Sequence, residues 1–347
     1  MTPTEVDPVS GSGGRFEDTG PRRLWRELGI QDWLVGTYLL GLNVAAVVAP
    51  PSPLRVVCLQ QVFALLMYLV ATLVLVRSRL IKNDFVAAVL YRLAIYGTVQ
   101  FSYFLFVHFL PVVNPRTLDQ ELYHLDLKLF GFEPAIWMDQ FVTPATTTWF
   151  SFFYFGFFFL LGAHVIPILL FTRNRQLLSE FTMGMLIIFC VGHTLYMFVP
   201  GYGPYRAMAH EFHHQLPRGL WLDMIRATVA TSGAQKDIFP SMHTAGPVFI
   251  ALYSLRHRKR LPYRYTWPIA CFFTANMMVA TLFLRWHYVI DVIAGLFLAG
   301  AGLPLCVWLT RLELSRRAEL DLAPSWPEFF PENGSSKTRI SSDLAAA

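Results

Sequence analysis

Two stretches of this sequence place histidine at the head of an apolar run. In "FLRWHYVIDVIAG" (283–295), His287 and Asp291 are four residues apart, so on a helix they share one face about a turn apart. A carboxylate beside an imidazole fixes the tautomer of the ring and stabilises the imidazolium that forms during reaction. The pair is therefore built like an oriented nucleophile or base.

The second histidine lies in "KDIFPSMHTAGPVF" (236–249). Pro240 suits the first turn of a helix, and Ser241 beside it offers a hydroxyl and an exposed backbone N–H. We expect the start of this helix to be an anion site of the kind that phosphate favours. His243 would stand over that anion, placed to give or take a proton.

Two arginines could add fixed positive charge. Arg285 lies two residues before His287, and Arg206 ends the Pro/Gly turn of "YMFVPGYGPYR" (196–206). Either guanidinium could grip phosphate oxygens. With the histidines, the aspartate and the serine, they supply what phosphoryl transfer needs: a nucleophile, an acid for the leaving group and a positive clamp. We expect no metal and no cofactor at a site of this kind.

The composition indicates the elements that must position these residues. Of the 347 residues, 54% are hydrophobic and only 15% are charged, whereas soluble domains carry about 25% charged residues. Apolar runs near the bilayer-spanning length of roughly 20 residues recur along the chain. The net charge of +5 comes mainly from clusters between these runs, as the positive-inside rule produces, so we expect the bilayer and not nucleic acid as partner. The sequence predicts an all-α, polytopic membrane protein.

Eight spans are predicted, and every strong basic cluster falls on one side of the membrane if all eight are real. Both termini are then cytoplasmic, and His243 and His287 share the outer, extracellular or lumenal face. Leucines at helical spacing in 118–129 predict an amphipathic helix on the outer interface. The expected spans are 31–50, 57–76, 85–112, 145–171, 180–199, 241–255, 266–284 and 287–310.

We predict four parts of the chain. The two ends are rich in Ser, Gly, Pro and charge, which is typical of flexible segments. The parts are a flexible N-terminal tail (1–28), two accessory transmembrane helices (29–84), a catalytic membrane domain (85–312) and a flexible C-terminal tail (313–347).

The motifs "FPSMH" and "HYVID" resemble, in order, the two signature motifs of the type-2 phosphatidic acid phosphatase superfamily. The resemblance covers roughly 114–310. Within it, "LDLKLFGFEP" (125–134) and "VPGYGPYR" (199–206) look like the branch that contains inositol phosphorylceramide synthases. The resemblance implies a six-helix core and a lipid phosphate or phospholipid substrate.

Residue roles follow from the resemblance. It implies that His287 is the nucleophile that forms a phosphohistidine, Asp291 its partner, and His243 the acid that protonates the leaving group. Ser241 would hydrogen-bond the phosphate. The phosphatase branch has an arginine where this chain has Thr281, and its upstream Lys/Arg…Arg-Pro motif has no clean match here. These departures favour transfer of a phosphoryl or inositol-phosphate-like headgroup to a lipid hydroxyl, with hydrolysis by a phosphatidic acid or polyprenyl phosphate phosphatase as the alternative.

A rival motif is "HEFHH", in which His210, Glu211 and His214 satisfy the HExxH pattern of zinc metalloproteases. The stretch ends at Pro217 and offers no obvious third ligand. We therefore interpret His210 and His214, together with Tyr205, as candidate contacts to a polar headgroup. A transporter that uses the histidines as a proton relay is a third alternative, but the polar residues gather at one face and not at the midplane.

Overall fold

The structure is a computed structural model that describes residues 21–232 and 234–329. Throughout these two ranges the regular elements are helices, and a single bridge between Gly201 and Asp237 is the only β-type pairing. Seven helical segments are long and apolar enough to cross a membrane, which confirms the predicted all-α, polytopic class. They are Ile30–Val48, Pro53–Arg77, Asp84–Val113, Pro144–Phe171, Arg175–Phe198, Tyr263–Phe283 and Val289–Glu319.

The remaining expected span, 241–255, corresponds to helix α13 (Met242–Arg256), which has only 15 residues. A helix of that length is about 22 Å long, less than the roughly 30 Å of the hydrocarbon core. Nearly all of its residues are buried, because α9, α10, α14 and α15 pack around it. The helix that carries His243 is therefore a short element inside the bundle.

The remaining elements are assigned as follows. The first spans are α2 (Ile30–Val48), α3 (Pro53–Arg77), and α4 (Asp84–Arg92) continued through the π-helix η1 (Leu93–Gly97) into α5 (Thr98–Val113). The later spans are α8 (Pro144–Phe155) with α9 (Phe157–Phe171), α10 (Arg175–Phe198), α14 (Tyr263–Phe283) and α15 (Val289–Glu319). Shorter elements are α1 (Pro21–Glu27), α6 (Asp119–Phe130), α7 (Pro134–Trp137), η2 (Met138–Phe141), α11 (Pro204–Ala207), η3 (Ala209–Glu211) and α12 (Leu220–Ser232).

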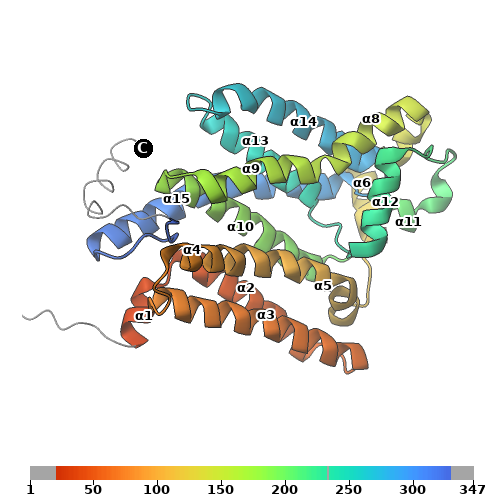
Figure 1. Cartoon of the computed structure of the whole chain (residues 1–347). Helices are drawn as coiled ribbons and strands as arrows, with labels where there is room; N and C mark the ends of the chain where they lie inside the picture. Colours follow the sequence, from red (N-terminus) through yellow and green to blue (C-terminus); the bar gives the residue numbers. More distant parts are fainter. Residues whose placement is uncertain (1–20, 233, 330–347) are drawn as a thin grey trace, which may run out of the picture.

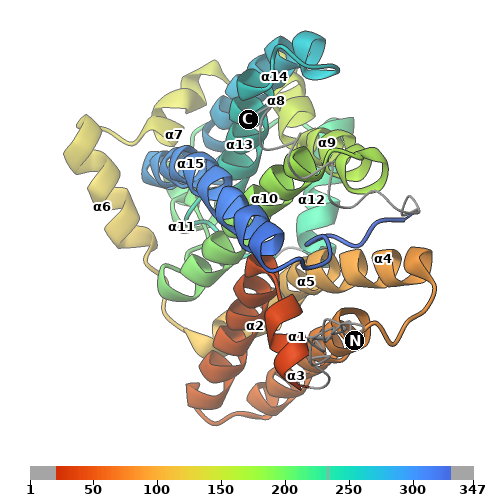
Figure 2. The ribbon, with the colours of Figure 1, turned by 90° about the vertical axis from the view of Figure 1, so that its left-hand side faces the viewer.

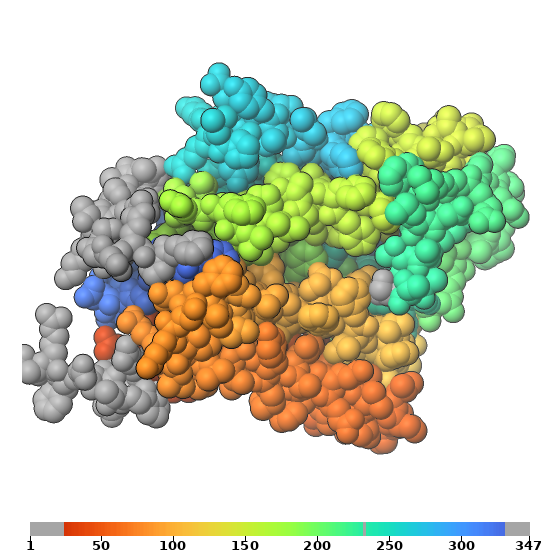
Figure 3. Space-filling model, in the orientation of Figure 1, coloured from red at the N-terminus to blue at the C-terminus, as the bar shows by residue number. Residues whose placement is uncertain are grey.

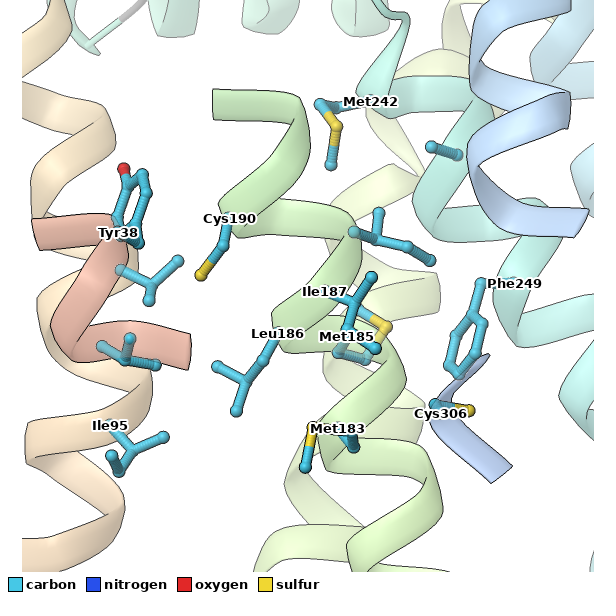
Figure 4. Close-up of a cluster of buried hydrophobic side chains, with 14 of the residues drawn as sticks. Tyr38, Ile95, Met183, Met185, Leu186, Ile187, Cys190, Met242, Phe249 and Cys306 are labelled. Atoms are coloured by element: carbon cyan, nitrogen blue, oxygen red, sulfur yellow. The ribbon is translucent and has the colours of Figure 1, made fainter. Parts of the chain in front are cut away.

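Helix α10 forms the centre of the bundle. It is the most enclosed of the spans, with 72% of its most apolar window buried. Viewed along the bundle in Figure 2, it lies between the N-terminal helices and the group formed by α9, α13 and α15. Figure 4 shows its apolar side chains, among them Leu186 and Ile187, between Tyr38 and Ile95 on one side and Phe249 on the other. The catalytic candidates on α13 and α15 are thus supported by a packed apolar core.

The two ends of the bundle differ. Elements α6, α8, α11 and α12 gather at one end, whereas α1 and the C-terminal part of α15 lie at the other (Figure 1). The space-filling view shows α3–α5 as a layer alongside α8, α9 and α14 (Figure 3). The predicted interfacial helix, 118–129, corresponds to α6. Its end of the molecule also carries the first turns of α13 and α15, where the candidate residues lie.

The predicted boundary of the C-terminal tail at residue 313 lies inside a helix. Helix α15 continues to Glu319, because Glu313 and Arg317 form a buried ion pair one turn apart. The segment after it packs back onto the bundle, where Trp326 is buried against Tyr91. At the other end, α1 falls within the predicted N-terminal tail. The rest of the two predicted tails, 1–20 and 330–347, lies outside the described residues.

Candidate active site

The pair His287 and Asp291 lies where the turn after α14 enters α15. The His287 Nδ1 is 3.4 Å from the Asp291 Oδ2, and both side chains are buried. The same carboxylate oxygen accepts the backbone N–H of Tyr288 at 2.9 Å, so it caps the first turn of the helix. His287 lies two residues before the start of α15, so the pair does not share a face of one helix as expected, although the two side chains are in contact. The bond to Tyr288 fixes the orientation of the Asp291 carboxylate.

His243 faces this pair from α13. The centroids of the His243 and His287 rings are 6.2 Å apart. The His243 ring stacks on Tyr154 at 4.1 Å and packs against Phe157 at 4.4 Å, so α8 and α9 fix its orientation. The two imidazoles therefore lie near enough for one bound group to contact both of them.

Ser241 is the N-cap residue of α13 and is fully buried. Its backbone N–H donates to the carbonyl oxygen of Asp291 at 3.0 Å, and its Oγ accepts the Thr244 hydroxyl at 3.2 Å. The predicted exposed N–H at Ser241 is therefore wrong: the bond to α15 uses it. This bond is possible because α15 has a glycine at the contact, and a Cβ on Gly295 would lie 2.7 Å from the Ser241 carbonyl oxygen.

Arg285 points to the segment that precedes α12. Its Nη2 lies 2.7 Å from Asp139 Oδ1 and 2.6 Å from the carbonyl oxygen of His214, and its guanidinium covers the Phe212 ring. Burial would raise the pKa of Asp139, but hydrogen bonds from His214 and the charge of Arg285 outweigh it and hold that pKa below its usual range. Burial also lowers the pKa of Arg285. This arginine is already paired with a carboxylate.

Arg206 and Tyr205 lie together on α11. The Arg206 guanidinium is exposed and stacks over the Tyr202 ring at 3.8 Å. The Tyr205 ring packs against Trp286 at 4.4 Å, and its backbone N–H donates to the Arg285 carbonyl oxygen at 2.7 Å. These contacts bring α11 next to the turn that carries His287. Arg206 is thus a cation close to the site, and its described contacts include no carboxylate.

The "HEFHH" stretch does not form the helix that a zinc protease motif needs. The 3-10 helix η3 ends at Glu211, so His210 and His214 do not share a helical face. His210 is exposed and contacts Glu211, whereas His214 Nδ1 is bound to Asp139 at 3.0 Å. Within 21–232 and 234–329, no group of three or more His, Cys, Asp or Glu residues is arranged to hold a metal ion.

Helix α6 holds the start of α15, a role that the sequence analysis missed. Asp126 accepts the backbone N–H groups of Val289 at 2.6 Å and Ile290 at 3.0 Å, so it caps α15 from another element. Asp119 likewise accepts the N–H groups of Tyr202 and Gly203. The two aspartates are seven residues apart on one helical face, and that spacing was the signal available in the sequence.

Two further groups at the site were not singled out from the sequence. The buried indole Nε1 of Trp286, directly before His287, has no hydrogen-bond partner among the described residues. Asp237, four residues before Ser241, accepts the hydroxyl of Tyr103 at 2.8 Å. Neither position belongs to a motif, so the sequence carries no signal of its role at the site.

The fold and the site define a class: a polytopic helical membrane protein in which a His–Asp pair and a second histidine meet at the heads of two packed helices. Residues 120–305, more than half of the chain, match the family model described as the PAP2 superfamily, and the chain belongs to this superfamily. Membership implies a lipid phosphate phosphatase or phosphotransferase, and members typically work without a metal. No curated protein and no solved structure matches the chain.

Proposed function

We propose that this protein is an integral membrane phosphotransferase that acts on a lipid phosphate ester through a phosphohistidine at His287. It would move a phosphoryl or inositol-phosphate-like headgroup to a lipid hydroxyl, as the inositol phosphorylceramide synthase branch does. The observation that supports this best is the 6.2 Å separation of His243 from an imidazole already paired with Asp291. One histidine can attack phosphorus while the other donates a proton to the departing oxygen.

The proposed reaction has two steps. In the first, the lone pair of His287 Nε2 forms a P–N bond, the P–O bond to the leaving group breaks, and His243 gives its proton to the departing oxygen. Asp291 keeps the Nδ1 proton in place and stabilises the charged ring. In the second, His243 takes the proton of the acceptor hydroxyl, the acceptor oxygen attacks phosphorus, and the P–N bond breaks.

We assign the stabilisation of phosphate charge to groups that have unused hydrogen-bond donors. Within 21–232 and 234–329 the buried Trp286 Nε1–H has no hydrogen-bond partner, and Arg206 carries an exposed guanidinium. Ser241 Oγ would add a contact at the head of α13. Because Arg285 is paired with Asp139, we propose that it mainly fixes the 212–214 segment. His214 of this segment, together with His210 and Tyr205, would contact the headgroup.

The assignment to the synthase branch is supported by Thr281, which stands where the phosphatase branch has a phosphate-binding arginine. At position 281, where the phosphatase branch has arginine, Thr281 is buried and its hydroxyl donates to the Met278 carbonyl oxygen in the same helix. A site with few free cations suits a phosphodiester, which carries one negative charge, better than a phosphate monoester with two. A lipid phosphate phosphatase that hydrolyses the same intermediate is the second candidate function.

We propose the same placement as the charge pattern indicates: both termini cytoplasmic and the site at the outer or lumenal face. The basic residues of the 256–264 loop lie between α13 and α14, at the ends of these helices away from His243. The catalytic domain would span 85–312, with 29–84 as accessory helices. The headgroup of the lipid substrate would then lie at the membrane interface, and the acyl chains of the lipid would lie among the helices.

The test uses purified enzyme in detergent with labelled phosphatidic acid and, separately, labelled phosphatidylinositol plus ceramide. A new phospholipid whose formation depends on His287 and is not accompanied by free phosphate supports the transferase. Free phosphate alone supports the phosphatase. His287→Ala and His243→Ala should each abolish turnover in folded protein, and neither a chelator nor added zinc should change the rate.

A further inference from the structure

Asp237 lies on the segment that leads into α13, next to the site, although no motif includes it. Its Oδ2 accepts the Tyr103 hydroxyl from α5 at 2.8 Å, and its backbone pairs with Gly201. From Gly201 the chain continues to Tyr205, whose N–H bonds to the turn that carries His287. Four residues after Asp237, Ser241 caps α13. The carboxylate is therefore fixed between the segments that carry both catalytic histidines.

Electrostatic contacts place the same carboxylate close to the reacting groups. Burial raises the pKa of Asp237, whereas the Tyr103 hydrogen bond and the charge of His287 lower it. The Asp237 charge also acts on Tyr205, whose pKa burial raises, and on Tyr154, whose ring stacks on His243. Asp237 thus shares one environment with His287 and with the aromatic residues that hold His243.

Asp237 is half-buried, and its hydrogen-bond partners differ from those of the buried acidic residues. Asp119 and Asp126 each accept two backbone N–H groups. Several others pair with arginine: Asp32 with Arg77, Asp139 with Arg285, and Glu313 with Arg317. For Asp237, the described contacts of the carboxylate include the Tyr103 hydroxyl and its own backbone N–H, and no lysine or arginine. Lys236 beside it points instead to the carbonyl oxygens of residues 114–116.

A half-buried carboxylate at the site is accessible to a further hydrogen-bond donor. It has the acceptor capacity for one, since an ionised carboxylate offers about four lone-pair positions and the Tyr103 hydroxyl and the Asp237 backbone N–H use two. The donor that completes it must be neutral and polar, because a phosphate oxygen beside it would be repelled. A hydroxyl group meets both conditions.

We propose that Asp237 binds a hydroxyl of the substrate that does not itself react, next to the phosphate held between His243 and His287. This inference rests on the proposed function and narrows its substrate to a polyol. The hydroxyl can belong to the headgroup of the donor phospholipid or to a second alcohol of the acceptor lipid. In both cases the reacting hydroxyl still gives its proton to His243, and the Asp237 carboxylate only accepts a hydrogen bond.

The test compares Asp237→Asn with the wild type on matched substrates. One arm sets phosphatidylinositol against phosphatidylethanol as the donor, and the other sets a ceramide-type diol against a long-chain monoalcohol as the acceptor. Sites that hydrogen-bond a substrate hydroxyl reject the analogue that lacks it strongly, so we expect a wild-type preference of at least about 100-fold in kcat/KM in one arm. Asp237→Asn should reduce that preference by about tenfold or more, and the arm in which this occurs identifies the source of the hydroxyl.

Two variants keep the result interpretable. Tyr103→Phe leaves the carboxylate but removes its anchor, and should weaken the same preference less. Asp223→Asn on α12 is the matched control, because Asp223 pairs only with exposed arginines. A preference that is absent in the wild type, or unchanged in folded Asp237→Asn, overturns the assignment. Labelling of His287 by donor lipid in the absence of acceptor separates this outcome from a failure of the proposed function, which would give no labelling in any variant.

Discussion

The contact between α13 and α15 at Gly295 should be necessary for catalysis. A methyl group there would lie 2.7 Å from the Ser241 carbonyl oxygen and 3.0 Å from the Thr244 Cβ. Ordinary contact begins near 3.4 Å, so Gly295→Ala requires α13 and α15 to separate by about 0.7 Å. The atoms that must move belong to the backbone at the N-cap of α13, two residues before His243.

The magnitude follows from this displacement. Overpacking of a core contact typically costs about 1–3 kcal/mol, and a misplacement near 1 Å at a reacting centre can lower the rate by about 100-fold. Because His243 lies on α13 and the turn that carries His287 leads into α15, separation of these helices moves the two rings apart, and we expect Gly295→Ala to reduce kcat by about 10–100-fold. The KM for the lipid should change much less, since the headgroup contacts lie on other elements.

The assay measures turnover and thermal melting of the same detergent-purified samples. Gly300→Ala is the matched control, because a Cβ at Gly300 on the same helix would meet nothing within 4 Å. It should keep wild-type kcat and an equal or higher Tm. Wild-type turnover in Gly295→Ala would show that the close approach of α13 and α15 does not set the catalytic geometry.

Three further predictions concern residues around the site. Asp126→Ala leaves two N–H groups of α15 without acceptors, so it should cost about 2–4 kcal/mol in thermal unfolding and lower kcat, whereas Glu121→Ala, on the exposed side of α6, should do neither. Burial raises the pKa of Glu133 to about 7, so the folded protein binds this proton more tightly and loses stability as the pH rises from about 4.5 through 7. Glu133→Gln should therefore flatten this dependence and stabilise the protein by about 1–3 kcal/mol at pH 8, and an unchanged pH profile would contradict the assignment. A double-mutant cycle of Arg285→Gln and Asp139→Asn should give a coupling energy of about 1–3 kcal/mol, whereas additive effects would mean that Arg285 acts mainly on the substrate.

The sequence predicted the class of fold and the helices that carry the site because both depend on local patterns. Apolar runs of bilayer length identified seven of the spans. The four-residue spacing of His287 and Asp291 predicted their contact, although His287 precedes α15 by two residues. The remaining expected span, 241–255, is the short helix α13, which is covered by surrounding helices and not by lipid. Its position inside the bundle depends on tertiary packing that hydropathy does not record.

The rest of the site depends on contacts between residues far apart in the chain. The backbone N–H of Ser241 was expected to be free to bind an anion, but it donates to the carbonyl oxygen of Asp291, 50 residues later. Arg285 was expected to face phosphate, but a carboxylate 146 residues earlier pairs with it. Asp126 was not selected, although its seven-residue spacing from Asp119 marks one face of α6. Asp237 was not selected, because an isolated acid carries no local signal of the side chain that it will meet.

Direct detection of phosphohistidine tests the central claim. The wild type would be mixed with phospholipid labelled at phosphorus, without acceptor, then quenched in base and mapped by mass spectrometry, since a P–N bond survives base but not acid. We predict acid-labile label on the peptide that contains His287, its absence in His287→Ala, and its disappearance when acceptor is added. Label on another residue, or wild-type turnover in His287→Ala, would contradict the account.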